Sequence, residues 1–499
     1  MKKKLSPSPL IPLSTLQKLK LVPARKSPAP TQVMLVDAAG QGVCGVVVGV
    51  PKTFRGKPGE RLDLVDGASR SLVVGCGKRP AAAEDSRAFW EGAGAAVAQA
   101  LQAANVDEAE LAGPLGDGTA PFALGALLAG YDNQLYRKAP GKDAWQPRTL
   151  RVPGLDAATL ARTVSLADAI NWARALVEAP ANHLTPAAFV DEVRALADFG
   201  IEVEVLDLAA LEKLGAHGLL AVGRSSVHPP YLAVARWNGR GKRNRKIDLA
   251  IAAKGLTFDA GGLNLKMVAI DKMKLDMGGA AGAIGALRVM AERRAPINAM
   301  AVLALCENVI AADAYRPGDV IGSLEGLTIE VANADAEGRI VLADAITYAK
   351  RQDPALLVDM ATLTGSIAGT FHHEFAGLYC NDGPLLEMLQ AAADSTGDAL
   401  WRMPLSPLHD YVVESDIADV RNLGAPGVFG NAAGSSIAGA KFLERFAKDA
   451  RWAHLDMAST VLTMRPKGPI KPGPTGWGVR LLADVADRIA RKPQATAKS

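Results

Sequence analysis

The chain has 499 residues, of which 49% are hydrophobic and 22% charged, and its formal net charge is +4. This length exceeds what one hydrophobic core usually serves, so we expect more than one domain. No segment approaches the roughly 18 consecutive apolar residues of a membrane helix. The four cysteines are far apart in the sequence, which predicts buried free thiols. Together these features predict a cytoplasmic protein without a membrane span.

Residues 1–30 form a basic, proline-rich segment that we predict to be a disordered tail. It contains six prolines, and no acidic residue precedes Asp37. The prolines interrupt any apolar run, which argues against a secretory signal. An arm that binds nucleic acid and a segment that targets an organelle stay open as alternatives.

Residues 31–155 alternate between strand and helix patterns. We expect strands at 33–36, 45–50 and 72–75, a helix over 85–104, and a strand or buried helix over 121–128. This alternation predicts a small N-terminal α/β domain. Gly40–Gly45 spells G-x-G-x-x-G, but it runs into a Val-rich strand where a dinucleotide site requires a helix, so we interpret it as a turn.

Residues 156–182 predict a linker helix that ends at Pro180, because proline blocks its continuation. Residues 183–499 then predict a larger α/β/α domain with a mixed, mainly parallel sheet. Its strands are expected at 201–205, 246–253, 297–306 and 355–359, and its helices at 185–199, 277–293 and 338–351. The overall fold class is therefore α/β.

Acidic residues from three separate segments fall at strand ends and helix starts in this larger domain. Ligand sites in α/β sheets collect at the carboxyl ends of strands, and helix N-termini hold negative charge favourably. Carboxylates that meet there can hold a pair of divalent cations and activate a water. The candidate metal ligands are Lys254, Asp259, Asp276, Asp335 and Glu337.

Two further cations lie among these acids. Lys266 can stabilise an oxyanion, since it can remain charged at the open end of the site. Arg339, in the first turn of a helix, can bind a small planar anion in bidentate fashion. The sequence contains no H-E-x-x-H, P-loop or G-x-S-x-G motif, and we interpret His372 and His373 as surface or packing residues. From the residues alone, another two-metal hydrolase such as a phosphoesterase remains an alternative.

The segment Asn333-Ala-Asp-Ala-Glu-Gly-Arg339 resembles the signature of the leucyl (cytosol) aminopeptidase family of metallopeptidases. The segments at 254–262, 276–281, 358–365 and 452–458 resemble the same family. The likeness runs from about Asp168 to residue 482, whereas the first third resembles the family only in its α/β character.

The resemblance implies a dinuclear aminopeptidase that uses zinc or manganese and a metal-bridging hydroxide to release N-terminal residues from short peptides. Asp259 and Glu337 would bridge both metals, Asp335 would complete one metal site, and Lys254 and Asp276 would complete the other. Lys266 would polarise the scissile carbonyl, and Arg339 would hold a bicarbonate that acts as general base. A homohexamer is also implied, and an additional or replacing role in DNA binding stays open.

The resemblance also implies a substrate pocket whose uncharged lining should favour Leu and Met and disfavour acidic side chains. The candidate substrate-binding residues are Met273, Asn333, Thr362, Leu363, Gly365 and Ala458. Two positions depart from the family pattern: Ala334 stands where the family usually has Thr, and the loop 267–275 is one residue shorter.

Overall fold

The computed structural model describes residues 11, 16–25, 27–44, 50, 51, 53–67, 69–81, 86–139, 141, 144–241, 244–424 and 435–491. These residues form two compact units. The larger unit contains Trp172–Leu462 and the described residues from Pro474 on, and the smaller unit contains the described residues from Leu16 to Asn171 with Thr463–Gly473. The chain passes from the smaller unit to the larger one within α4 (Ala157–Glu178), inside the predicted linker.

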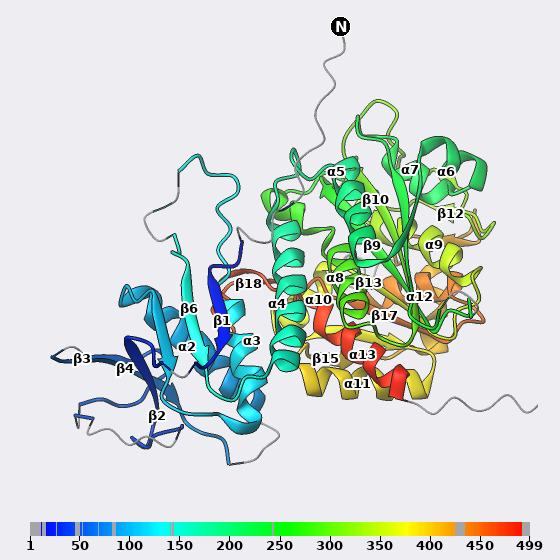
Figure 1. The fold of residues 1–499 in the computed structure, drawn as a ribbon. Helices are drawn as coiled ribbons and strands as arrows, with labels where there is room; N and C mark the ends of the chain where they lie inside the picture. The colour runs from blue at the N-terminus through cyan, green and yellow to red at the C-terminus, as the bar shows by residue number, and fades with distance from the viewer. Residues whose placement is uncertain are drawn as a thin grey trace, which may run out of the picture. The chain divides into compact units, whose positions relative to one another are not determined.

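The smaller unit is built on a six-stranded sheet with the order β1-β6-β5-β2-β4-β3 (Figure 1). Only β3 runs antiparallel to its neighbour among these described strands. The helices α2 and α3 pack so closely that a Cβ on Gly94 or Gly125 would clash with a carbonyl oxygen of the other helix. The elements are β1 (Leu19–Pro23), β2 (Thr31–Asp37), β3 (Arg61–Asp66), β4 (Ser69–Gly77), α2 (Ser86–Ala103), β5 (Glu108–Leu111), η2 (Gly116–Gly118), α3 (Thr119–Ala129) and β6 (Arg148–Val152).

The prediction of a disordered tail was wrong for Leu19–Pro23. This segment is strand β1, which pairs in parallel with β6 and buries Leu19 and Leu21 on one face. An apolar residue at every second position with an available partner strand outweighs the basic and proline-rich composition around it. The ambiguous segment 121–128 is helical, within α3. The strand expected at 45–50 lies outside the described residues up to position 49.

The larger unit contains an eight-stranded mixed sheet with the order β15-β14-β17-β13-β9-β10-β8-β7, which confirms the predicted fold class. The neighbours β17, β13, β9 and β10 are parallel, whereas β8 and β7 are antiparallel at one edge. The strands are β7 (Glu202–Leu206), β8 (Tyr231–Asn238), β9 (Leu249–Asp259), β10 (Asn298–Asn308), β13 (Leu357–Ala361), β14 (Ala376–Cys380), β15 (Leu400–Arg402) and β17 (Trp452–Asp456). The short strands are β11 (Val320–Ile321), β12 (Ile329–Glu330), β16 (Val420–Arg421), β18 (Leu462–Thr463) and β19 (Gly473–Pro474).

Helices cover both faces of this sheet. Gly255 of β9 faces Ala280 of α8, while Ala252 belongs to the core formed with α9 and α12. The helices are α5 (Pro186–Arg194), η3 (Ala195–Phe199), α6 (Leu208–Leu214), α7 (His217–Gly223), η4 (Ile270–Leu275), α8 (Gly278–Glu292), α9 (Glu337–Lys350), α10 (Gly365–Phe371), α11 (Gly383–Thr396), η5 (Pro407–Val413), α12 (Ser435–Phe446) and α13 (Val479–Arg491).

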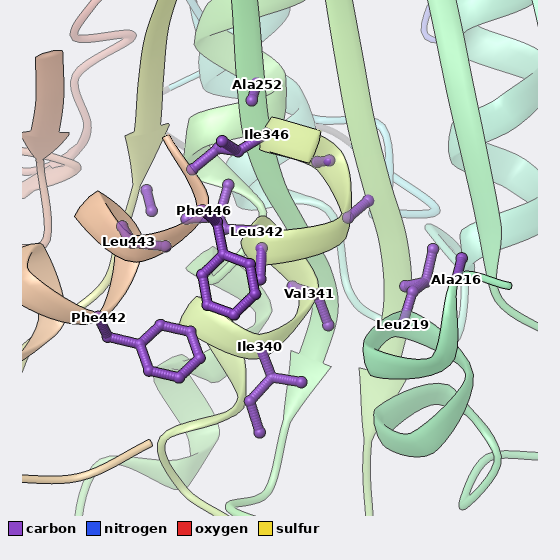
Figure 2. Packing of buried hydrophobic residues seen from close by; sticks show 14 of the residues in the cluster. Ala216, Leu219, Ala252, Ile340, Val341, Leu342, Ile346, Phe442, Leu443 and Phe446 are labelled. Carbon is purple, nitrogen blue, oxygen red and sulfur yellow. The ribbon is translucent and has the colours of Figure 1, made fainter. Parts of the chain in front are cut away.

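The core beside α9 fixes the position of this helix. Figure 2 shows Ile340, Leu342 and Ile346 of α9 near the aromatic rings of Phe442 and Phe446 of α12, and all of these side chains are fully buried in one core. Burial of each such side chain stabilises the fold by about 1.5–3 kcal/mol. The first turn of α9 is therefore held rigidly at the carboxyl end of β9.

The structure also bears on the predicted free thiols and on the predicted absence of a membrane helix. Cys44, Cys76, Cys306 and Cys380 are free thiols, the first three buried and Cys380 half-buried. In the part of the chain that is described, no helix has both the length and the apolar character needed to cross a bilayer.

Candidate active site

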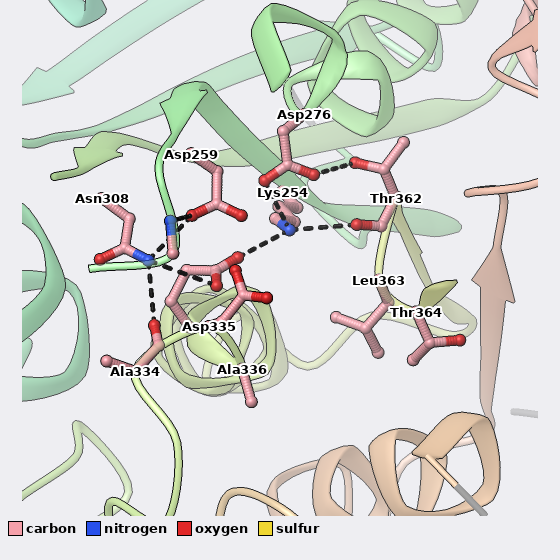
Figure 3. A network of polar contacts seen from close by, with 12 residues as sticks. Lys254, Asp259, Asp276, Asn308, Ala334, Asp335, Ala336, Thr362, Leu363 and Thr364 are labelled. Carbon is pink, nitrogen blue, oxygen red and sulfur yellow. Dashed lines mark hydrogen bonds and ion pairs between the residues drawn. The ribbon is translucent and has the colours of Figure 1, made fainter. Parts of the chain in front are cut away.

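Residues from three segments meet at the carboxyl end of β9. Lys254 and Asp259 lie on β9, Asp276 directly precedes Met277 and α8, and Glu337 is the first residue of α9. Asp335 lies two residues before Glu337, and Lys266 lies in the loop after β9. The ion pairs of the structure thus join all five predicted metal ligands and Lys266 in one cluster. Figure 3 shows four of the ligands: Lys254, Asp259, Asp276 and Asp335.

A β-bulge lets both β9 residues reach this cluster. Side chains alternate between the faces of a strand, so Lys254 and Asp259, five positions apart, would point to opposite faces of a regular strand. The pairing of β9 with β10 shifts by one residue between Cys306 and Glu307, because β9 carries an extra residue there. This shift reverses the alternation and turns Asp259 toward the same face as Lys254.

Lys254 lies at the buried end of the cluster. Its Nζ is 2.7 Å from Asp276 Oδ2 and 2.9 Å from Glu337 Oε1, and it donates to the Thr362 carbonyl oxygen at 3.0 Å. The absence of a Cβ at Gly338 makes room for this side chain, because a Cβ there would come 2.7 Å from Nζ and displace it. Burial opposes the charge on Lys254, but Asp276 and Glu337 outweigh burial and raise its pKa.

Lys266 lies at the open end of the cluster. Its Nζ is 2.7 Å from Asp259 Oδ2 and also pairs with Asp335 Oδ1. The side chain of Asp335 is 31% exposed, whereas that of Asp259 is 2% exposed. Solvent therefore reaches the cluster on the side of Asp335 and Lys266.

The cluster has more negative than positive charge. Four carboxylates face two ammonium groups. Burial, together with repulsion from Glu337, raises the pKa of Asp259 and Asp335, and burial raises that of Asp276 to about 6. Burial also disfavours the charge on Glu337, but Lys254 and Lys266 keep its pKa below the usual value.

These residues fit a divalent cation. One oxygen from each of Asp259, Asp335 and Glu337 lies within 4.8 Å of the others, and carboxylate oxygens are ligands for hard and borderline divalent metals. Such an ion would neutralise the excess negative charge and favour the ionised carboxylates, against the burial that raises the pKa of Asp259, Asp276 and Asp335.

Two asparagine side chains that hold the loop before α9, which carries Asp335, were not predicted from the sequence. Asn308, fully buried at the end of β10, donates through Nδ2 to Asp259 and to the Ala334 carbonyl oxygen at 2.9 Å each. Asn422 accepts from Ala332 N at 2.7 Å and donates to the Asn333 carbonyl oxygen at 2.7 Å. Asn308 follows a buried strand, so the strand-end rule that selected Asp259 would also have selected it.

Arg339 is 3% exposed and lies in the first turn of α9, two residues after Glu337. Among residues 16–424 and 435–491, as far as they are described, nothing accepts a hydrogen bond from its Nε or Nη1. Burial lowers its pKa to about 10, so the guanidinium stays charged at neutral pH. A buried guanidinium whose Nε and Nη1 have no acceptor among the described residues is suited to a small planar anion.

Two of the predicted pocket residues, Thr362 and Asn333, contact members of the cluster, and two others contact Asp456. Thr362 donates from Oγ1 to Asp276 Oδ1 at 2.7 Å, and the backbone N–H groups of Leu363 and Ala458 donate to the buried Asp456. Asn333 accepts from the Asp335 backbone N–H at 2.6 Å.

The other residues named from the sequence lie on neighbouring elements. Gly365 begins α10, and Met273 lies in η4, three residues before Asp276. The ring Nδ1 of His373 lies 3.0 Å from the Ser459 carbonyl oxygen.

Comparison with known proteins gives the family. The catalytic-domain model of the cytosol aminopeptidase family matches residues 171–483, and the model of the N-terminal domain of the same family matches residues 50–140. The chain belongs to the cytosol aminopeptidase family. As a member, it is a metal-dependent aminopeptidase. The match at 50–140 also corrects the expectation that the first third shares only its α/β character with the family.

Individual relatives match nearly the whole chain. A probable cytosol aminopeptidase from Gluconobacter oxydans (strain 621H) is 39% identical over 485 residues, which cover 92% of this chain and 96% of that protein. One from Caulobacter vibrioides is 39% identical over 459 residues, covering 89% of this chain and 91% of the relative.

Solved structures agree with these relatives. The bottromycin maturation enzyme BotP is 30% identical with a TM-score of 0.81, covering 93% of this chain and 99% of the other. A second BotP structure, described as a complex with Mn, has the same identity and TM-score. These solved structures therefore support the same cytosol aminopeptidase fold for this chain.

Proposed function

We propose that this cytosol aminopeptidase removes N-terminal residues from short peptides with two divalent ions, manganese or zinc, per chain. The carrying observation is that the carboxylates form two adjacent groups around two cationic positions. Asp276 and Glu337 flank Lys254, and Asp259 and Asp335 flank Lys266. The proposed ligands are the five named from the sequence, with Asp259 and Glu337 shared between the ions.

The metals, when bound, would supply a nucleophilic water at neutral pH and polarise the substrate carbonyl. The side chains of the protein would position the reacting groups and stabilise the charge that develops. Asp276 and Thr362 hold each other at the closed side through a 2.7 Å hydrogen bond. Lys266, at the open side, keeps a positive charge beside the position where the scissile carbonyl would develop negative charge. Arg339 would hold a bicarbonate ion as general base, because its Nε–H and Nη1–H groups, which have no acceptor among the described residues, match that planar anion.

Specificity should follow from the uncharged lining near the cluster. Met273, Thr362, Leu363, Gly365 and Ala458 offer no cation for an acidic side chain, whose desolvation would go uncompensated. A missing methylene in an apolar pocket changes binding by only about 1–3 kcal/mol, so kcat/KM should fall gradually from Leu and Met to Ala. A Glu substrate should be far poorer, and a Glu substrate as good as Leu would refute this pocket.

We infer a cytoplasmic homohexamer from family membership, and light scattering at six times the chain mass would test the assembly. DNA binding through the basic N-terminal segment is the competing role for this chain. It predicts steep salt dependence of duplex binding that is lost when the basic residues before strand β1, 1–15, are deleted.

Replacement of a proposed metal ligand, either one that binds a single ion or one that binds both, tests the proposed reaction. Asp335→Ala and Glu337→Ala should abolish hydrolysis of leucine amide and lower the content of bound metal. Glu414→Ala is the matched control, since Glu414 is an exposed carboxylate outside the cluster. Full activity in either ligand variant would refute the assignment.

A further inference from the structure

Asn308 lies at the point where β10 ends beside the carboxylate cluster. It pairs in register with Asp259 on the parallel neighbour β9, and this pairing exists because of the bulge between Cys306 and Glu307. Without the shift, Asn308 would lie opposite Phe258 and Asp259 would face the other side of the sheet. The bulge therefore brings one amide and one carboxylate face to face.

The amide group of Asn308 contacts two of the proposed ligands. Its Nδ2 donates to Asp259 Oδ1 at 2.9 Å and lies 3.4 Å from Glu337 Oε2. The same nitrogen donates at 2.9 Å to the carbonyl oxygen of Ala334, in the loop that carries Asp335. Figure 3 shows these contacts radiating from one nitrogen atom.

The orientation of this amide is fixed by its surroundings. All three neighbours of Nδ2 are acceptors, so rotation of the amide would place Oδ1 against two carboxylates and a carbonyl oxygen. Oδ1 points instead toward Gly262, where a Cβ would come within 2.8 Å of it. Asn308 is fully buried, so water does not compete for the amide protons.

We propose that Asn308 is a positioning residue for the metal site, which holds Asp259, Glu337 and the Ala334 carbonyl in one arrangement. This inference rests on the proposed two-metal function. Each carboxylate has one oxygen engaged by the amide, which restricts its rotation and leaves the other oxygen for a cation. Partners that orient metal ligands typically change metal affinity or activity by about 10–100-fold when they are removed.

The same strand provides a matched control. Asn298, at the opposite end of β10, is 2% exposed and also makes three hydrogen bonds through its side chain. Its partners are the backbone groups of Arg240, Asn244 and Lys246. Replacement of Asn298 therefore removes a comparable buried network, without touching a proposed ligand.

The test measures Mn²⁺ binding to protein stripped with EDTA, with free Mn²⁺ quantified by electron paramagnetic resonance. Asn308→Ala and the similarly branched Asn308→Leu should bind Mn²⁺ about 10–100-fold more weakly than the parent. Asn298→Ala should bind Mn²⁺ with the affinity of the parent. Thermal unfolding of the metal-free proteins should nevertheless show that the Asn308 and Asn298 variants are both less stable than the parent.

The outcomes separate this inference from the function on which it rests. Parent-like Mn²⁺ affinity in a folded Asn308→Leu protein, or an equal loss in Asn298→Ala, would overturn the positioning role while leaving the two-metal reaction intact. A parent protein that binds no Mn²⁺ and is inactive would instead overturn the proposed function, and this inference with it.

Discussion

Replacement of Lys266 by Ala should change catalysis and metal binding in opposite directions. The Nζ of Lys266 lies 2.7 Å from Asp259 Oδ2 and pairs with Asp335. Burial opposes its charge, but Asp259 and the other carboxylates raise its pKa, so the ammonium is present at neutral pH. Its removal deletes one of the two positive charges that face four carboxylates.

The expected magnitudes follow from this geometry. Loss of one group that stabilises a developing oxyanion costs about 10²–10³ in kcat, or about 2.7–4 kcal/mol. The affinity for Mn²⁺ should rise, since the remaining carboxylates carry one more uncompensated negative charge. Even at an effective dielectric constant of about 20, two unit charges about 4 Å apart interact by about 4 kcal/mol, so the increase should be measurable.

The assay combines leucine amide hydrolysis with calorimetric titration of Mn²⁺ into the metal-free protein. Lys272→Ala is the control, because Lys272 lies nearby in the chain but its side chain is 58% exposed and pairs only with Asp271 among the described residues. Unchanged kcat in Lys266→Ala would refute the catalytic role, and weaker Mn²⁺ binding would refute the electrostatic reasoning.

Three further predictions concern protons, the anion and stability. Burial opposes the charge on Lys254, but neighbouring carboxylates raise its pKa, and burial raises the pKa of Asp276 to about 6. A bound Mn²⁺ must therefore displace the protons of these two groups. Its affinity should fall as the pH drops below about 6, and calorimetry in two buffers should detect proton release at pH 7. Arg339→Ala should lower kcat by about 10²-fold with bound metal unchanged and abolish any stimulation by bicarbonate, whereas parent-like stimulation would refute the anion site. Burial raises the pKa of Asp344 to about 7, although the backbone N–H groups of Leu324 and Leu219 donate to its carboxylate. The folded state therefore binds the Asp344 proton more tightly than the unfolded state does. The stability that this protonation contributes is lost as the pH rises from about 4 to 7. Asp344→Asn, which loses one acceptor at a cost of about 1–3 kcal/mol, should show a larger deficit in urea unfolding at pH 5 than at pH 7, and an equal deficit would contradict the shift.

The cluster could be predicted because its members follow general rules of α/β sheets. Asp259 ends a buried strand, and Asp276 and Glu337 lie at helix starts, which are positions that collect at one edge of a sheet. The family resemblance then supplied the roles of these residues. Their distances could not be predicted, since they depend on the packing of α9 against α12 and the sheet.

Other features depended on contacts that a local pattern does not contain. Strand β1 forms because β6, more than a hundred residues later, offers it a parallel partner. The role of Asn308 depends on a one-residue bulge in β9, and nothing in the hydrophobic pattern of that strand marks the extra residue. The helix α3 has a nearly uniform apolar sequence whose periodicity does not distinguish a helix from a strand, and its Ala- and Leu-rich composition and close contact with α2 favour the helix.

Titration of metal against activity is the most direct test of the central claim. Protein stripped with EDTA receives increasing Mn²⁺, and bound ions and leucine amide hydrolysis are measured in the same samples. We predict no hydrolysis without metal and full activity only when two ions are bound per chain. Full hydrolysis by the metal-free protein, or maximal activity with a single bound ion, would contradict the two-metal account.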